Sequence, residues 1–293
     1  GPDSMYTAEL VAANGNNLWI IGAGSSDLVD GINDGQVISG DQVIQFLDFN
    51  VLIGGSGTDT FEFGDGVLSG TLQGGAGDDV FDVRLLGVDA VTRIDGGEGN
   101  DILILSGGDS AGLMTFTAAL NGGEIDYSLG DNRLRLTHQA VESIRDQSLV
   151  ESLEVRGSSQ ADIISLANGS FRVNTGPVVE YANKAHLAVR AGINDLIQIN
   201  DHLVVAESVT LANGTVIAND PANSSITTGH LILEATRDVG LASARLRTSL
   251  DALSVRDSVG DIYLQEQNGL DLQQFNANGV FDLVLLNGNL TNS

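Results

Sequence analysis

Three aspartates, Asp59, Asp79 and Asp101, occupy the same place in three copies of a nine-residue pattern, Gly-Gly-x-Gly-x-Asp-x-apolar-x. The copies are GGSGTDTFE (54–62), GGAGDDVFD (74–82) and GGEGNDILI (96–104). Glycines permit tight turns with carbonyl oxygens directed at one point, and each aspartate adds a carboxylate. Oxygen-only donor sets with several carbonyls favour Ca²⁺ over Mg²⁺. The pattern therefore predicts calcium sites.

The spacing of the copies predicts how these donors meet. Their first residues lie 20 residues apart (74 − 54) and then 22 (96 − 74), about the length of one coil of a parallel β-solenoid, so the turns should stack. Stacking would form one cage from carbonyls with Asp59 and Asp79 and a second from carbonyls with Asp79 and Asp101. The glycines expected to line these cages are Gly55, Gly57, Gly75, Gly77, Gly97 and Gly99.

Short strands must hold the turns in place. Each copy follows an extended tripeptide with an apolar centre, at 51–53, 71–73 and 93–95. The apolar eighth positions, Phe61, Phe81 and Leu103, are expected to point inward and stack as a core column.

The block resembles the calcium-binding nonapeptide β-roll of RTX proteins, and three in-phase copies carry the resemblance. A full roll of that family has two nonapeptides per coil, whereas the other half of each coil here (64–70 and 84–91) lacks the signature. One column of sites is therefore expected. The resemblance implies Ca²⁺ as the bound ion and export by a type I secretion system.

Composition narrows the class of protein. The 293 residues contain 39 Asp and Glu against 13 Lys and Arg, a net charge of −26 with a pI of about 4.1. This charge argues against nucleic acid or an anionic membrane as partner. The chain has no cysteine, which suits a secreted protein cross-linked by calcium, although a cytosolic chain could equally lack cysteine. No apolar run approaches 18 residues, so no direct membrane insertion is expected.

The first fifty residues suggest a tag remnant followed by an end structure. Residues 1–5 are interpreted as an expression-tag remnant. Residues 6–50 are expected to form an N-terminal cap and degenerate coils, with a worn turn ending at Asp27 and either an insertion or a cap around 31–41. A strand is expected at 18–21, with Trp19 as a capping core residue.

Beyond the calcium-binding coils (51–110), residues 111–223 are expected to form degenerate solenoid coils. Alternating runs at 115–119, 133–137 and 152–155 predict half-buried strands, whereas 139–149 could form a short helix. Worn turns end at Asp162 and Asp195, and both are expected to keep the turn shape without binding calcium.

Residues 224–293 follow a different sequence pattern. Runs at 229–235, 260–267, 269–273 and 279–285 each open with glycine and alternate apolar with polar residues. They resemble filamentous-haemagglutinin-like repeats of giant bacterial exoproteins and adhesins. The resemblance implies that the array continues beyond this chain, with neighbouring repeats of the same protein as partners and a cell-surface or matrix ligand as a further one.

The sequence contains little evidence for catalysis, for other metal sites or for sugar binding. The four histidines are not paired at metal spacing and are expected at the surface or in turns, and no nucleophile elbow, His-Glu-x-x-His motif or phosphate loop occurs. Asp261, Glu266 and Asp271 could line one face of a polysaccharide-modifying β-helix, but no lysine lies near them. For a sugar-binding module aromatic residues are few at 5%, and most of the candidate phenylalanines are expected to point inward: Phe61, Phe81, Phe275 and Phe281.

The sequence thus predicts an all-β, right-handed parallel β-solenoid with about 20 residues per coil. Its expected role is that of a non-catalytic, calcium-stabilised structural segment of a large secreted bacterial surface protein or adhesin. The alternative is a carbohydrate-binding or polysaccharide-modifying β-helix module.

Overall fold

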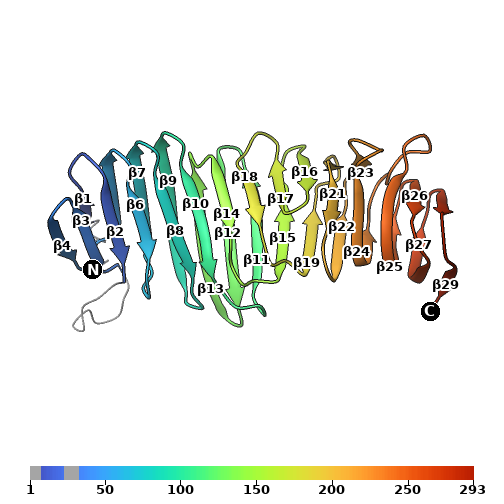
Figure 1. Ribbon diagram of the computed structural model, residues 1–293, viewed down its shortest axis with the longest axis horizontal. Helices are drawn as coiled ribbons and strands as arrows, with labels where there is room; N and C mark the ends of the chain where they lie inside the picture. The colour runs from blue at the N-terminus through green and yellow to red at the C-terminus, as the bar shows by residue number, and fades with distance from the viewer. Residues whose placement is uncertain (1–7, 23–32) are drawn as a thin grey trace, which may run out of the picture. The chain divides into compact units, whose positions relative to one another are not determined.

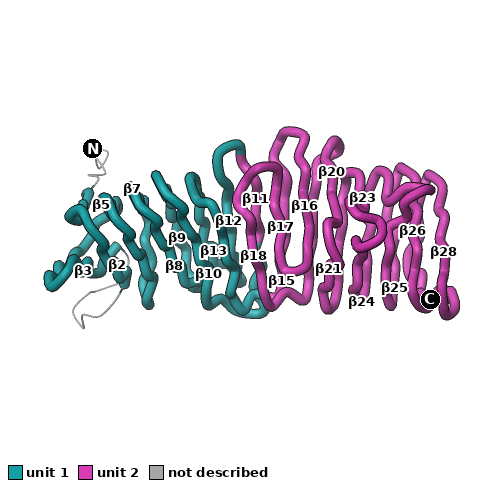
Figure 2. The backbone as a smooth tube through the Cα atoms, turned by 45° about the horizontal axis from the view of Figure 1, so that its top comes forward, with its two compact units in different colours: residues 1–114, 120–150 teal, residues 115–119, 151–293 magenta. Residues whose placement is uncertain are grey.

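The computed structural model describes residues 8–22 and 33–293, which form strands β1 to β29 and contain no helix (Figure 1). The predicted all-β class is confirmed. The tag remnant at 1–5 and the worn turn at Asp27 lie outside the described residues. The chain forms two compact units, residues 1–114 with 120–150 and residues 115–119 with 151–293 (Figure 2).

Unit 1 is built from two rows of parallel strands. The first row contains β1 (Glu9–Val11), β5 (Val51–Ser56), β7 (Gly70–Ala76), β9 (Ala90–Glu98) and β13 (Asn132–Gln139). The second contains β2 (Asn17–Ile21), β6 (Thr60–Phe63), β8 (Val80–Leu85), β10 (Ile102–Gly107) and β14 (Ser143–Asp146). Leu52 pairs with Leu72 and Leu72 with Ile94, so the strand offsets reproduce the 20- and 22-residue spacing of the motif.

Antiparallel strands complete unit 1. β3 (Gly35–Ser39) pairs with β2, and β4 (Gln42–Phe46) pairs with β3, which places an antiparallel pair where an insertion or cap was expected. β12 (Gly122–Leu129) pairs with β13, and β11 (Leu113–Ala119) is divided between the units.

The short helix suggested for 139–149 was wrong. Residues 143–146 form β14, which pairs in parallel with β10. Backbone pairing to an existing neighbour outweighs the weak local preference of this segment.

An aromatic column forms the core of the motif coils. Trp19 stacks on Phe61 with ring centroids 5.5 Å apart, and Phe61 stacks on Phe81 at 5.1 Å. Leu103 pairs in register with Phe81, and all four side chains are fully buried. The inward eighth positions and the core role of Trp19 are confirmed.

Unit 2 is also rich in parallel strands. Its longest row contains β15 (Ser152–Arg156), β19 (His186–Arg190), β22 (Ser208–Ala212), β24 (Ser225–Glu234), β25 (Leu246–Ser258), β27 (Leu270–Ala277) and β29 (Leu290–Asn292). The remaining strands are β16 (Ile163–Ala167), β17 (Ser170–Val173), β18 (Val178–Tyr181), β20 (Leu196–Ile199), β21 (His202–Val204), β23 (Thr215–Ala218), β26 (Ile262–Glu266) and β28 (Phe281–Leu285). Each alternating or glycine-initiated run predicted from the sequence contains strand residues, although Gly260, Gly269 and Gly279 precede their strands.

Two inward or outward assignments were wrong. Phe275 is 46% exposed rather than buried, because β29 pairs with only Leu270–Leu272 of β27. It nevertheless pairs with buried Val255, and its ring packs against Phe281 with centroids 4.7 Å apart. His138 is buried rather than superficial, since it follows Leu134 and Leu136 on the inward face of β13.

Candidate metal centre

The three motif turns stack directly on one another. In each coil the fourth-place N–H donates to the third-place carbonyl of the next, Gly57 to Ala76 and Gly77 to Glu98, both at 2.7 Å. The glycines at the second and fourth places have φ between +105° and +143°. A side chain at Gly75 would also collide with the carbonyl oxygen of Gly55. Glycine is therefore needed both for backbone conformation and for close approach.

The three aspartates form a buried ladder. The Asp59 N–H donates to Asp79 Oδ1 at 2.7 Å, and the Asp79 N–H donates to Asp101 Oδ1 at 2.8 Å. Each residue is 0% exposed. The structure therefore brings together the predicted pairs Asp59 with Asp79 and Asp79 with Asp101.

The second oxygen of each carboxylate has no hydrogen-bond donor: Asp59 Oδ2, Asp79 Oδ2 and Asp101 Oδ2 are all buried and unpaired. A Cβ placed on Gly54 would collide with both Asp59 Oδ2 and the Gly74 carbonyl oxygen. The same holds at Gly74, for Asp79 Oδ2 and the Gly96 carbonyl oxygen. At these two steps, a carboxylate oxygen of one coil and a carbonyl oxygen of the next coil thus point into the same small space.

The buried surroundings of these three aspartates disfavour their ionised forms when no cation is bound. Burial raises the pKa of Asp59 and of Asp101. Burial and the neighbouring carboxylates raise the pKa of Asp79 to about 6, although the hydrogen bond from the Asp59 N–H lowers it. Stacked acceptor oxygens in a dry turn require a proton or a cation between them.

A fourth copy of the turn precedes the three, although the motif pattern in the sequence does not reveal it. Strand pairing aligns β1 with β5 and β2 with β6 at the same offset, Glu9 with Val51 and Trp19 with Phe61. Residues 12–17, AANGNN, therefore stand opposite 54–59, GGSGTD. Two alanines and an asparagine obscure the motif. The signals that remain are Gly15, with φ +122° against +124° for Gly57, and the apolar eighth position, here Trp19.

In this fourth turn an amide nitrogen stands where a carboxylate oxygen stands in the others. Asn17 Nδ2 donates to the carbonyls of Ala13 and Gly15 at 3.0 and 2.8 Å. It also donates to Gly54 O at 3.2 Å and to Asp59 Oδ1 at 2.6 Å. Four oxygens of two adjacent turns thus surround one positively polarised group.

The same set of oxygens recurs between the turns of Asp59 and Asp79. There a carboxylate oxygen, Asp59 Oδ2, takes the place of the Asn17 amide nitrogen. By register, the equivalents of the four oxygens are the carbonyls of Gly55, Gly57 and Gly74 with Asp79 Oδ1. Of these, the Gly74 carbonyl oxygen converges with Asp59 Oδ2 on the Cβ position of Gly54. Carbonyls joined by two carboxylates are the donor chemistry that Ca²⁺ takes in proteins. In the described part of the chain no three His, Cys, Asp or Glu side chains gather at one point, and this arrangement calls for only two.

The worn turns at Asp162 and Asp195 differ in this respect. The Asp162 N–H donates to Asp195 Oδ1 at 2.9 Å, so the ladder itself is kept. However, Ser158 N–H donates to Asp162 Oδ2, and Gly192 N–H donates to Asp195 Oδ2. Donors within each turn satisfy the oxygens that remain unpaired in the motif coils.

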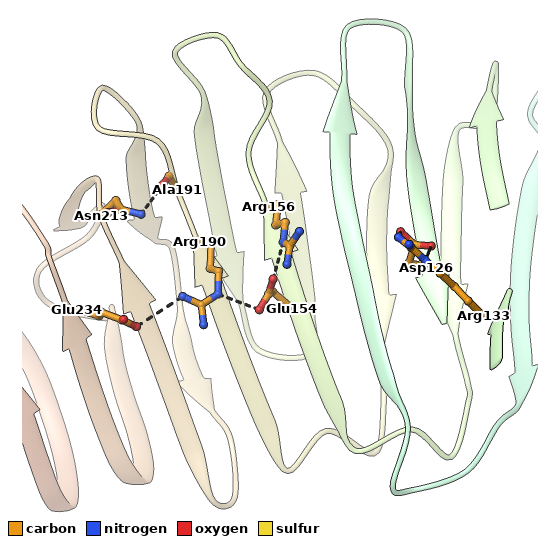
Figure 3. A network of polar contacts seen from close by, with 8 residues as sticks. All are labelled: Asp126, Arg133, Glu154, Arg156, Arg190, Ala191, Asn213 and Glu234. Atoms are coloured by element: carbon orange, nitrogen blue, oxygen red, sulfur yellow. Dashed lines mark hydrogen bonds and ion pairs between the residues drawn. The ribbon is translucent and has the colours of Figure 1, made fainter. Parts of the chain in front are cut away.

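Charged side chains on unit 2 form a surface ladder of ion pairs (Figure 3). Glu154 accepts from Arg156 and from Arg190, the latter at 2.9 Å, and Arg190 reaches Glu234 at 3.5 Å. Burial alone would raise the pKa of Glu154, but these hydrogen bonds lower it. Figure 3 also shows the exposed Arg133–Asp126 pair of the β12–β13 hairpin, at 2.6 Å. Exposed ion pairs of this kind each contribute little to stability.

No protein-family model, curated protein or solved structure matches this chain. Within residues 8–22 and 33–293 no helix long and apolar enough to cross a bilayer occurs.

Proposed function

We propose that this chain is a non-catalytic, calcium-stabilised structural segment of a large secreted bacterial surface protein or adhesin. Its strands would form a right-handed parallel β-solenoid, with Ca²⁺ held between the stacked turns of unit 1. Parallel pairing at offsets of 20 and 22 residues in the motif coils supports the coil length.

One observation carries the proposal. Three buried carboxylate oxygens in consecutive coils have no donor and face carbonyl oxygens of the next coil. Where the column meets Asn17, a side-chain amide supplies the positive group that the aspartate turns lack. One cation between the turns of Asp59 and Asp79, and another between those of Asp79 and Asp101, would satisfy Asp59 Oδ2 and Asp79 Oδ2 in the same way.

Calcium would act through linkage between binding and folding. The cage consists of turns from different coils, so it exists only when the coils are stacked. Each occupied site therefore adds about 1.4 kcal/mol of stability at a tenfold excess of calcium over its Kd. Extracellular calcium modules typically bind at about 10⁻⁴–10⁻³ M, so the segment would stay loosely folded in a calcium-poor cytosol and become rigid after export.

The partners we propose are neighbouring repeats of the same protein and a cell-surface or matrix ligand. The exposed apolar side chains of Val284 on β28 and Leu290 on β29, 37% and 48% exposed, support the first. A further parallel strand would cover this kind of surface.

Thermal unfolding with and without calcium tests the proposal. The melting temperature should rise by several degrees in millimolar calcium relative to chelator, because two sites at tenfold excess contribute about 3 kcal/mol. Magnesium at equal concentration should give a much smaller rise, since it prefers a strict octahedron and retains its waters. An equal melting temperature in calcium and in chelator would refute the linkage.

A further inference from the structure

The motif column continues one step past its last recognisable copy. β9 pairs with β13, Ile94 with His138, and β10 pairs with β14, Ile102 with Ser143. These registers place Ala140 opposite Gly96 and Glu142 opposite Asp101. Three residues, 140–142, therefore stand opposite the six residues 96–101. This turn lacks the Gly-Gly-x-Gly-x-Asp pattern altogether.

Glu142 takes the place of the missing aspartate. The Asp101 N–H donates to Glu142 Oε2 at 2.7 Å, as the N–H of Asp59 and of Asp79 donates to the next aspartate. A longer side chain compensates for a turn that is three residues shorter. The carboxylate ladder thus has four rungs rather than three.

The oxygen convergence is also repeated at this step. A Cβ on Gly96 would collide with Asp101 Oδ2 and with the carbonyl oxygen of Ala140. Asp101 is 0% exposed, and its Oδ2 has no hydrogen-bond partner. A fully buried, unpaired carboxylate oxygen is therefore aimed into the space below the short turn.

The short turn leaves the outer residues of the last motif copy uncovered. Residues 97–100 are exposed, as is Glu142, whereas Gly75 and Gly77 of the preceding copy are only partly exposed. A cation here would keep more of its own water than one between the longer turns.

We propose a third calcium site, formed by the carbonyls of Gly97, Gly99 and Ala140 with the carboxylates of Asp101 and Glu142. This site rests on the proposed function, because it extends the same column. It is the most solvent-open site of the column and the weakest, and its Ca²⁺ exchanges fastest. The two ends of the column then differ, since Asn17 closes one end with an amide and Glu142 ends the other with an ion.

Calcium stoichiometry measured by isothermal titration calorimetry on the full chain tests this site. The wild type should bind three Ca²⁺ ions and Glu142→Gln two, because glutamine keeps the acceptor for the Asp101 N–H but removes one of the two negative charges that hold the ion. Glu98→Gln is the matched control. Glu98 is an exposed carboxylate of the adjacent turn whose side chain lies outside the donor set, and this variant should still bind three.

The outcomes separate the third site from the two it extends. Two ions in both the wild type and Glu142→Gln, or three in both, would overturn the third site and leave the proposed function intact. No calcium binding by the wild type would overturn both. The melting temperature in chelator serves as the folding control, and it should be equal or higher for Glu142→Gln.

Discussion

At the scale of single residues, one atom distinguishes the proposed calcium turns from the Asn17 turn. Asn17 and Asp59 occupy equivalent places in adjacent turns. The amide nitrogen of Asn17 lies within hydrogen-bond distance of four oxygens of its own and the next turn, whereas Asp59 Oδ2 has no donor. Replacing this nitrogen by oxygen removes the donor and leaves a buried acceptor that needs a positive charge, although Asn17 Oδ1 is itself buried without a hydrogen-bond partner.

Asp79→Asn should therefore have opposite effects in the two states. In chelator the variant should melt at or above the wild type, because its amide can donate to the oxygens around it as Asn17 does. In calcium it should melt lower, since Asp79 belongs to both predicted cages. Differential scanning calorimetry with calcium and with chelator measures both effects.

Two further variants provide comparisons for Asp79→Asn. Asp59→Asn should lose the calcium effect of one cage only, so equal losses for Asp59→Asn and Asp79→Asn would contradict the shared role of Asp79. Asp195→Asn should lower the melting temperature equally with and without calcium, because Gly192 and Asp162 already satisfy both oxygens of Asp195.

The raised pKa of Asp79, about 6, gives a pH dependence with a defined sign. The folded chain binds this proton more tightly than the unfolded chain, whose pKa is near 3.8. In chelator, the stability contributed by Asp79 should fall as pH rises from about 4 to about 6. At about 1.4 kcal/mol per pKa unit, the full change is on the order of 3 kcal/mol.

The difference between the wild type and Asp79→Asn isolates this effect. Burial lowers the pKa of His138 to about 4, which removes stability as pH falls below about 6.5, but both proteins share that loss. Urea unfolding of both proteins at several pH values measures the difference. A difference that is independent of pH between 4 and 7 would show that Asp79 is not desolvated in the folded chain.

At the scale of elements, glycine sets how closely the turns approach. Gly74 lies against Asp79 Oδ2 and the Gly96 carbonyl, in the space that the cation would need. Gly74→Ala should lower stability by about 1–3 kcal/mol through overpacking and should also abolish the calcium-induced rise in melting temperature from its cage.

Gly87→Ala is the matched control for this variant. A Cβ at Gly87 would meet only Leu129 Cδ2, at 3.4 Å, and Asn132 Nδ2, at 4.0 Å. Its calcium response should therefore equal that of the wild type. A Gly74→Ala protein with an unchanged calcium response would mean that the cation, if bound, lies elsewhere.

The predictability of these elements from sequence followed the strength of local signals. The three motif copies carry glycine, aspartate and an apolar residue at fixed places, so their strands, stacking and inward column were predictable. The Asn17 and Glu142 turns were not, because one has alanine and asparagine at key places and the other is three residues shorter. Only strand register, set by tertiary pairing, reveals that both belong to the column.

The same limit explains the errors. Residues 139–149 lack a strong strand pattern, and β10 imposes strand structure on 143–146. The alternation that suggested a buried Phe275 does not reveal which residues the next strand covers, and β29 pairs with only Leu270–Leu272 of β27.

At the scale of the molecule, the proposed calcium column lies entirely in unit 1. Its carboxylates belong to a chain with a net charge of −26, so bound divalent cations would also relieve part of the overall repulsion. Unit 2 contains the Asp162–Asp195 ladder, with its oxygens satisfied, and the ion-pair ladder around Arg190. We therefore expect the rigidity of unit 1 to depend on calcium and the stability of unit 2 to be independent of it.

The central claim is that calcium lies between the stacked turns of unit 1. Anomalous diffraction from crystals grown in millimolar calcium tests it most directly. The account predicts strong peaks between Asp59 and Asp79 and between Asp79 and Asp101, each 2.3–2.6 Å from carboxylate and carbonyl oxygens. A well-ordered map of these turns with no anomalous peak would contradict it.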